Sequence, residues 1–307
     1  MKKLFTVLLA FAISQAAFSQ QEVWYSMFFS NKVLLNPAYT GSRDALNITG
    51  FYRNQWTGFD GAPVSQSLTV HTPFLKQKMG LGLSLEHDKI GINNSMSLQL
   101  SYAYRLQLGF GRLAMGVHGK IERDNMNWSN SNPYTSIDQS IPYSDNSLFL
   151  PNLGAGLYFD NDFMYLGIST PHLVENTIDY SNSGGEVSSG AKQNRHYYLM
   201  AGGLIALSES LLLKPALMAR YVDNSPVELD FNLSFLIREM LWLGVSARTG
   251  NTYSAIAQVH LKNEWVVGYA YDFTFTKLNN FQNGTHEIMF SIDFGKKIKG
   301  FDNPRYF

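Results

Sequence analysis

The sequence predicts an all-β protein: a transmembrane, antiparallel, up-and-down β-barrel of the outer-membrane type, with about 14 strands. Three observations predict this fold class. Large apolar residues alternate with small or polar ones from about residue 44 to residue 294. Many of these alternating segments reach about ten residues, roughly twice the length of an ordinary globular strand. Short and long connections also alternate along the chain, as they do in bacterial outer-membrane barrels.

The alternation is clearest in residues 265–275. The odd positions there, such as Trp265 and Tyr269, are large and apolar or aromatic, whereas the even positions include Gly268 and Asp272. Because successive side chains of a strand point to opposite faces, such a segment has one apolar face and one small or polar face. The candidate strands cover residues 44–56, 64–74, 78–88, 94–107, 111–124, 150–160, 163–169, 194–206, 210–221, 228–238, 241–249, 253–261, 264–275 and 285–294.

The connections give the strongest argument for a membrane barrel. Those that follow even-numbered strands are all short, whereas the long ones, 125–149, 170–193 and 276–284, all follow odd-numbered strands. An even strand count places both barrel termini at the end with the short turns, which in bacterial barrels is the periplasmic end. A secreted β-sandwich, such as a lectin or adhesin, would show similar alternation but gives no reason for this parity.

In a barrel of this kind the large apolar positions face lipid and the remaining positions face the lumen. Charges of both signs are interspersed on the inward face, so we expect a lumen that is packed by paired charges or plugged, rather than a ring that selects ions. The segment 20–43 and the loop 125–149 are the candidate plugs. The predicted inward charged residues are Arg53, Glu86, Lys120, Glu122, Lys214, Arg220, Asp230, Arg238, Asp272 and Asp293.

The two ends of the chain carry features of their own. Lys2 and Lys3, an apolar run from Leu4 to Ile13 and small residues before Gln20 predict a signal peptide over residues 1–19. We therefore divide the chain into signal peptide 1–19, periplasmic N-terminal segment 20–43 (a plug or strap), barrel 44–294 and periplasmic tail 295–307. The tail has the basic and aromatic composition of a partner-binding anchor, although a basic solvated tail would look the same. Its candidate partner-binding residues are Lys296, Lys297, Lys299, Arg305, Tyr306 and Phe307.

Composition and motifs argue against several functions. Twenty-four basic residues balance 24 acidic ones, which disfavours a nucleic-acid partner. The seven histidines show no metal-ligand spacing, and no nucleophile elbow or phosphate-binding loop is present in the sequence. His87–Asp88 and His286–Glu287 are adjacent pairs, but neighbours in a strand point to opposite faces. We expect no enzymatic activity, no cofactor and no metal, and the absence of cysteine excludes disulfides.

Several motifs together resemble a known family. The first is Leu35-Asn36-Pro37-Ala38-Tyr39-Thr40-Gly41, the second is Tyr52-Arg53-Asn54-Gln55-Trp56, and the third contains Pro63 and Gln66. Near the other end, Gly284–Ile288 and Asn303–Phe307 complete the set. In this order they resemble the PorP/SprF family, outer-membrane barrels of the type IX secretion and gliding apparatus of Bacteroidota.

The resemblance implies a non-enzymatic role in protein export across the outer membrane. It implies as partners the periplasmic ring components, a peptidoglycan-linked protein and a secreted adhesin or other cargo with a sorting domain. A porin-like or structural channel for small solutes is the alternative. Asn36-Pro37 and Gly41 bend the chain just before the first strand, and the parity of the connections predicts that residues 36–41 lie at the periplasmic mouth. We expect Arg53 and Gln55 to point into the lumen and Tyr52 and Trp56 to face lipid or the rim.

Overall fold

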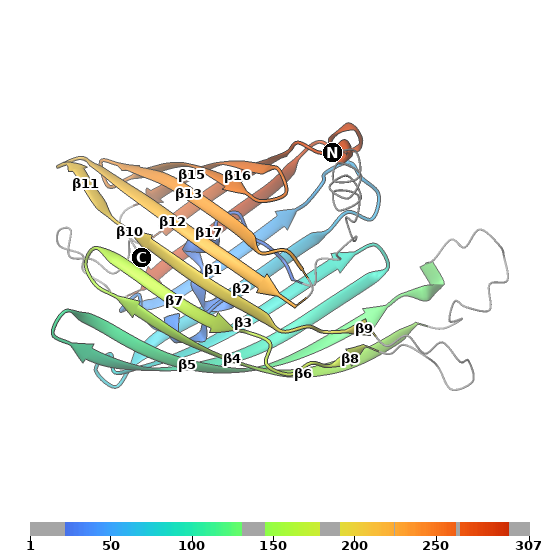
Figure 1. Cartoon of the computed structure of the whole chain (residues 1–307), viewed down its shortest axis with the longest axis horizontal. Helices are drawn as coiled ribbons and strands as arrows, with labels where there is room; N and C mark the ends of the chain where they lie inside the picture. The colour runs from blue at the N-terminus through green and yellow to red at the C-terminus, as the bar shows by residue number, and fades with distance from the viewer. Residues whose placement is uncertain (1–21, 131–144, 179–190, 224, 262–264, 295–307) are drawn as a thin grey trace, which may run out of the picture.

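The computed structural model describes residues 22–130, 145–178, 191–223, 225–261 and 265–294. Its main feature is a single antiparallel sheet of 15 strands that closes on itself (Figure 1). The strands are β1 (Leu46–Asn54), β2 (Val64–Phe74), β3 (Met79–Ile90), β4 (Asn93–Leu108), β5 (Gly111–Met126), β6 (Asn146–Asp160), β7 (Met164–Thr170), β10 (His196–Gly203), β11 (Ile205–Ser208), β12 (Leu211–Val222), β13 (Glu228–Ile237), β14 (Leu241–Arg248), β15 (Thr252–Leu261), β16 (Trp265–Thr274) and β17 (Thr285–Phe294).

Two pairings close the sheet, β1 with β17 and β10 with β12. β1 pairs with β17 from Leu46↔Phe294 to Asn54↔His286. β10 pairs with β7 on one side and β12 on the other, and β11 continues the same barrel strand past Leu204. The wall therefore has 14 strand positions, and its backbone groups bond within the sheet, as a hydrocarbon environment requires.

The predicted 14-stranded barrel is confirmed, with local differences. The predicted strand 194–206 is interrupted at Leu204. A small hairpin of β8 (Thr177–Ile178) and β9 (Ala191–Lys192), which the alternation did not indicate, lies between β7 and β10. The inward placement of Arg238 was wrong: this residue is exposed in the turn after β13, because its φ of 51° takes it out of the strand.

The exterior of the wall is apolar and the interior is small, polar or charged. On β4, for example, Leu98 and Leu100 are 39% and 61% exposed, while Gln99 and Ser101 between and beside them are buried. This is the polarity of a barrel in lipid, because a soluble sandwich would bury its apolar face instead. No helix in the described ranges is long and apolar enough to cross a membrane.

The two ends of the barrel differ. One end, which we name the short-turn end, holds the start of β1, the end of β17 and tight turns such as 109–110 between β4 and β5. The opposite, long-loop end holds the connections from β5 to β6 and from β7 to β10. The short-turn end lies at the left of Figure 1 and the long-loop end at the right.

The described residues that precede β1 lie inside the barrel. We name Glu22–Ala45 the luminal segment; it is the dark blue trace within the wall in Figure 1. It contains three short 3₁₀ turns: η1 (Phe28–Ser30), η2 (Lys32–Leu34) and η3 (Pro37–Tyr39). Two further 3₁₀ turns, η4 (Trp128–Asn130) and η5 (Lys277–Phe281), lie outside the lumen, in the connections at the long-loop end.

Candidate functional site

The lumen contains a buried ion-pair cluster near the long-loop end. Arg53 of β1 pairs with Asp272 of β16 (Nη2–Oδ2 2.7 Å) and with Glu287 of β17 (Nη1–Oε2 2.8 Å). All three side chains are at most 3% exposed. Alternation points each of them inward, and the closing register sets Arg53 directly opposite Glu287. The guanidinium is therefore what allows two carboxylates to be buried side by side.

The same two carboxylates hold the luminal segment. Glu287 accepts hydrogen bonds from the backbone N–H groups of Ser26 and Met27, each at 2.8 Å. The hydroxyl of Ser26 lies 2.7 Å from an oxygen of Asp272, to which it donates. Hydrogen bonds to ionised acceptors are stronger than neutral ones. The cluster thus joins the barrel closure to the segment inside it.

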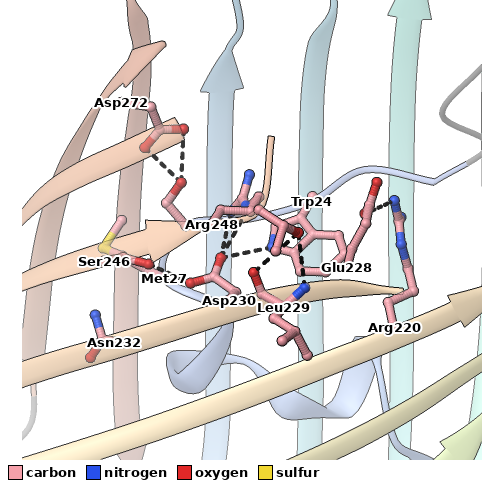
Figure 2. A network of polar contacts seen from close by, with 12 residues as sticks. Trp24, Met27, Arg220, Glu228, Leu229, Asp230, Asn232, Ser246, Arg248 and Asp272 are labelled. Atoms are coloured by element: carbon pink, nitrogen blue, oxygen red, sulfur yellow. Dashed lines mark hydrogen bonds and ion pairs between the residues drawn. The ribbon is translucent and has the colours of Figure 1, made fainter. Parts of the chain in front are cut away.

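Trp24 is held in a cationic pocket on the neighbouring wall (Figure 2). Its Nε1 donates to Asp230 at 3.0 Å, and the ring centroid lies 4.4 Å from the guanidinium carbon of Arg220 and 4.8 Å from that of Arg248. Arg248 pairs with Asp230 at 2.8 Å, and Arg220 pairs with Glu228. Such cation–π contacts are strongest where they are shielded from water, as here.

Glu22 anchors the segment closest to the long-loop end. Its carboxylate pairs with His172, which follows β7, and accepts a hydrogen bond from Tyr198 of β10. Burial alone would raise the pKa of this carboxyl, but His172 and His196 hold the pKa of Glu22 well below its usual range. The first described residue of the luminal segment, Glu22, is therefore an ionised carboxylate held in place by its partners on the wall.

The Asn-Pro turn rests on a floor of wall glycines toward the short-turn end. Asn36 caps η3 by accepting from the N–H of Ala38 at 2.9 Å, and its Nδ2 donates to the carbonyl of Leu157 at 2.9 Å. A Cβ at Gly116 would overlap the backbone of Pro37 and Ala38, and one at Gly156 would overlap the Asn36 amide. The segment backbone therefore lies directly against the wall.

Lys32 and Tyr39 fill the centre of this half. The Lys32 Nζ lies 4.8 Å from the ring centroid of Tyr39 and 4.2 Å from that of Tyr165. No described residue accepts a hydrogen bond from this ammonium group. Burial, together with the nearby positive charges of Lys214 and Arg43, lowers the pKa of Lys32 well below its usual range.

A second set of contacts holds residues 41–44, where the segment passes from the lumen into β1 at the short-turn end. Gly41, at a φ of 75°, donates its N–H to Nδ1 of His71 at 2.9 Å. Arg43 pairs with Asp293 of β17 at 2.9 Å, and Asp44 pairs with Arg112 of β5 at 2.9 Å. These contacts fix the chain just before it enters β1.

The arrangement fills the lumen rather than lining an open path. The cavity between Glu22, Leu35 and the wall measures about 80 Å³, room for only a few water molecules. A cavity of about 440 Å³ beside Asp44 and Arg112 lies at the short-turn end, where the segment enters β1. Within the described residues, no group of three or more His, Asp or Glu side chains is placed to hold a metal ion. Apart from Lys32 and Lys214, the charged groups described above are paired with each other or with the segment, which suits binding better than catalysis.

Comparison with known proteins decides the family. The family model described as type IX secretion system membrane protein PorP/SprF matches residues 17–292. The chain belongs to the PorP/SprF family. It is thus a type IX secretion membrane protein with an outer-membrane β-barrel, and its family indicates a non-enzymatic protein.

Solved barrels share the fold of this PorP/SprF member. The CymD monoaromatic hydrocarbon channel is similar with a TM-score of 0.50 and 12% identity, over 87% of this chain and 93% of that chain. A FadL homologue of Pseudomonas aeruginosa has a TM-score of 0.48 and 12% identity, over 86% of this chain and 94% of that chain. Omp33 of Acinetobacter baumannii has a TM-score of 0.46 and 9% identity, over 83% of this chain and 100% of that chain. At these identities the likeness concerns the fold alone. A search of curated proteins finds no significant match.

The structure separates the family-motif residues into three places. Tyr52 and Gln66 lie opposite each other on the outer face of β1 and β2. Gln55, Trp56 and Pro63 lie beyond the strand ends, where the Gln55 N–H donates to the Pro63 carbonyl at 2.9 Å. Asn54 ends β1, and the remaining motif residues, Asn36, Pro37, Ala38, Tyr39, Gly41 and Arg53, lie in the lumen.

Two placements therefore differ from the sequence-based expectation. The turn at residues 36–41 lies in the lumen rather than at its mouth, because the glycine floor leaves room for it there. Gln55 is not an inward strand residue, because β1 ends at Asn54 and Trp56 takes a φ of 50°. The predicted tail residues 296–307 and the signal peptide 1–19 lie outside the described residues.

The sequence reasoning missed several anchors of the luminal segment. Glu22, Trp24 and Ser26 lie in a stretch without periodicity, so nothing marked them. Glu287 could have been found: Ile288 and Phe290 face outward, which makes 287 an inward position, and closing β17 onto β1 sets it opposite Arg53.

Gly116→Ala tests whether the segment lies directly on the wall. The added Cβ overlaps the backbone of Pro37 and Ala38, so we expect the unfolding free energy to fall by about 1–3 kcal/mol. Limited proteolysis should then cut within residues 22–45. Gly119→Ala on the same strand is the control, since its Cβ would meet nothing within 4 Å. Equal behaviour of the two variants would contradict the packing described here.

Arg53→Ala tests the ion-pair cluster. Without the guanidinium, Asp272 and Glu287 are left as uncompensated buried carboxylates, which costs about 3–5 kcal/mol of unfolding free energy. Urea unfolding in lipid vesicles measures the loss, and protease sensitivity of residues 22–45 reports release of the segment. Arg123→Ala, at an exposed position of β5, should change neither. A loss as small as that of the control would contradict the role assigned to Arg53.

Proposed function

We propose that this PorP/SprF member is a closed docking barrel of the type IX machinery. It binds periplasmic ring components at its short-turn end and assists the export or anchoring of adhesin cargo. The observation that supports this best is the occupied lumen: most residues of the luminal segment between Trp24 and Arg43 are buried, and ion pairs and hydrogen bonds bind the segment to the wall.

The proposal includes an orientation. Bacterial barrels place their short turns in the periplasm, so the short-turn end, with barrel termini Leu46 and Phe294, faces the periplasm. The tail 295–307 follows Phe294 and therefore begins on that side. In this orientation Glu22, which binds His172 after β7 and Tyr198 of β10, lies toward the extracellular end of the barrel.

The tail is the proposed contact with the secretion machinery. Its three lysines, Arg305 and two terminal aromatics have the composition of an interface anchor. Family membership implies partners in the secretion machinery, and we propose that these are the ring components and a peptidoglycan-linked protein. The luminal segment 22–43 acts as the plug.

A channel for small solutes is the less favoured function. A porin requires water along its lumen, with charged side chains free to attract or repel solutes. Here the luminal charges Arg53, Asp272, Glu287, Arg43 and Asp293 are paired at 2.7–2.9 Å and buried.

Deletion of residues 295–307 tests the docking role. Since β17 ends at Phe294, we expect the variant to insert as a barrel whose gel mobility still changes on heating, but to lose co-purification with periplasmic ring proteins and to secrete less adhesin. Lys89→Ala together with Lys277→Ala removes two positive charges near the opposite end and should leave co-purification intact. Normal co-purification of the deletion variant would contradict the proposal.

A further inference from the structure

The wall binds the luminal segment at main-chain atoms as well as at side chains. Glu287 accepts from two successive backbone N–H groups, those of Ser26 and Met27, at 2.8 Å each. His71 accepts from the N–H of Gly41 at 2.9 Å. Ser169 donates to the carbonyl of Leu35 at 2.7 Å, and Arg105 to that of Thr40 at 3.1 Å. These contacts follow the segment along the lumen and do not depend on which side chains it carries.

The glycine floor serves the same kind of recognition. A Cβ at Gly80 would overlap the carbonyl of Thr40, and one at Gly116 would overlap the backbone of Pro37 and Ala38. Because these wall glycines have no side chain, the backbone of a bound polypeptide can approach the wall closely whatever its sequence. Side chains of the segment add selectivity: Trp24 contacts Arg220 and Arg248, Ser26 donates to Asp272, and Arg43 pairs with Asp293.

The wall does not need the segment to close. Residues 22–45 form short 3₁₀ turns and no strand, while β1 and β17 pair directly over nine positions from Leu46 to Asn54. Removal of the segment therefore breaks no ladder hydrogen bond of the barrel. Its covalent link to the wall is the single chain connection into β1, at the short-turn end.

We propose that the lumen is a binding site for a polypeptide segment folded in short turns, which the luminal segment occupies as a tethered ligand and which a segment of the exported adhesin takes over. This inference rests on the proposed function for the identity of the incoming chain. The geometry selects a chain with an indole for the pocket above Asp230, a small polar residue beside Asp272, and a tight turn without bulky side chains over Gly116 and Gly156.

Tethering sets the condition for exchange. A ligand joined by a short link acts at a millimolar effective concentration, so a free peptide competes poorly until the link is cut. An exported chain would overcome this through many simultaneous contacts.

The first experiment cuts the tether in the folded protein. A site-specific protease sequence is inserted between Ala45 and Leu46, and the purified barrel is cleaved in mild detergent. A fluorescent synthetic peptide of residues 22–45 is then added, and its anisotropy is measured. We expect the peptide to bind saturably. A peptide with Trp24→Ala should bind with at least tenfold lower affinity, and a scrambled peptide should not bind.

Barrel variants locate the binding. Glu287→Gln should weaken peptide binding at least tenfold, because the amide has one acceptor oxygen for the two N–H groups that the carboxylate holds. Glu239→Gln, in the exposed turn after β13, should bind like the parent. Failure of the labelled peptide to enter, or collapse of the barrel on loss of the segment, would overturn the inference. No other protein is present, so this result is independent of the docking proposal.

The second experiment locks the segment in place. The chain has no cysteine, so Thr40→Cys with Gly82→Cys provides one defined pair. The Thr40 Cγ2 lies 2.9 Å from the position of a Cβ at 82, within reach of a disulfide. We expect the oxidised protein to retain its periplasmic partners but to secrete the adhesin at least fivefold less than the reduced protein. Equal secretion by both forms would overturn the exchange while leaving docking intact.

Discussion

The burial of Arg53 between Asp272 and Glu287 is the interaction on which the rest of the structure depends. Two carboxylates 3% exposed or less cannot remain ionised side by side without it. The same three groups join three strands at the closure of the barrel, and through Ser26 and Met27 they also fix the luminal segment. The ion pairs that bridge the closing strands thus also anchor the luminal segment.

Filling the lumen changes what a porin-like fold can do. The wall has the closed, apolar-outside architecture of a channel, yet its inward groups bind a polypeptide rather than water. The segment is recognised at its backbone by Glu287, His71, Ser169 and Arg105, and at its side chains by the pocket around Trp24. A secretion component that handles polypeptides can use such a surface, whereas a solute channel would have to empty it.

The strands of the wall could be predicted from the sequence because the alternation of apolar and polar residues that determines them lies between residues close in sequence. Alternation in residues 265–275 gives both the strand and its lipid-facing side, and the parity of the connections gives the two ends. The path of residues 22–45 could not be predicted, because it has no period and follows from gaps at Gly116 and Gly156 that exist only in the closed barrel. Arg238 was misplaced because a turn conformation, not alternation, decides its direction. The pairing of Glu287 with Arg53 could have been predicted from the register in which β17 closes onto β1.

The central claim is that the luminal segment is bound inside the barrel by wall side chains. Amide hydrogen exchange of the intact protein in lipid nanodiscs tests it most directly, at the N–H groups of Ser26, Met27 and Gly41. Their acceptors are the buried Glu287 and His71, so we expect protection comparable to that of strand amides in β1 and β17. Exchange at the rate of an unstructured chain, with the strands still protected, would contradict the claim.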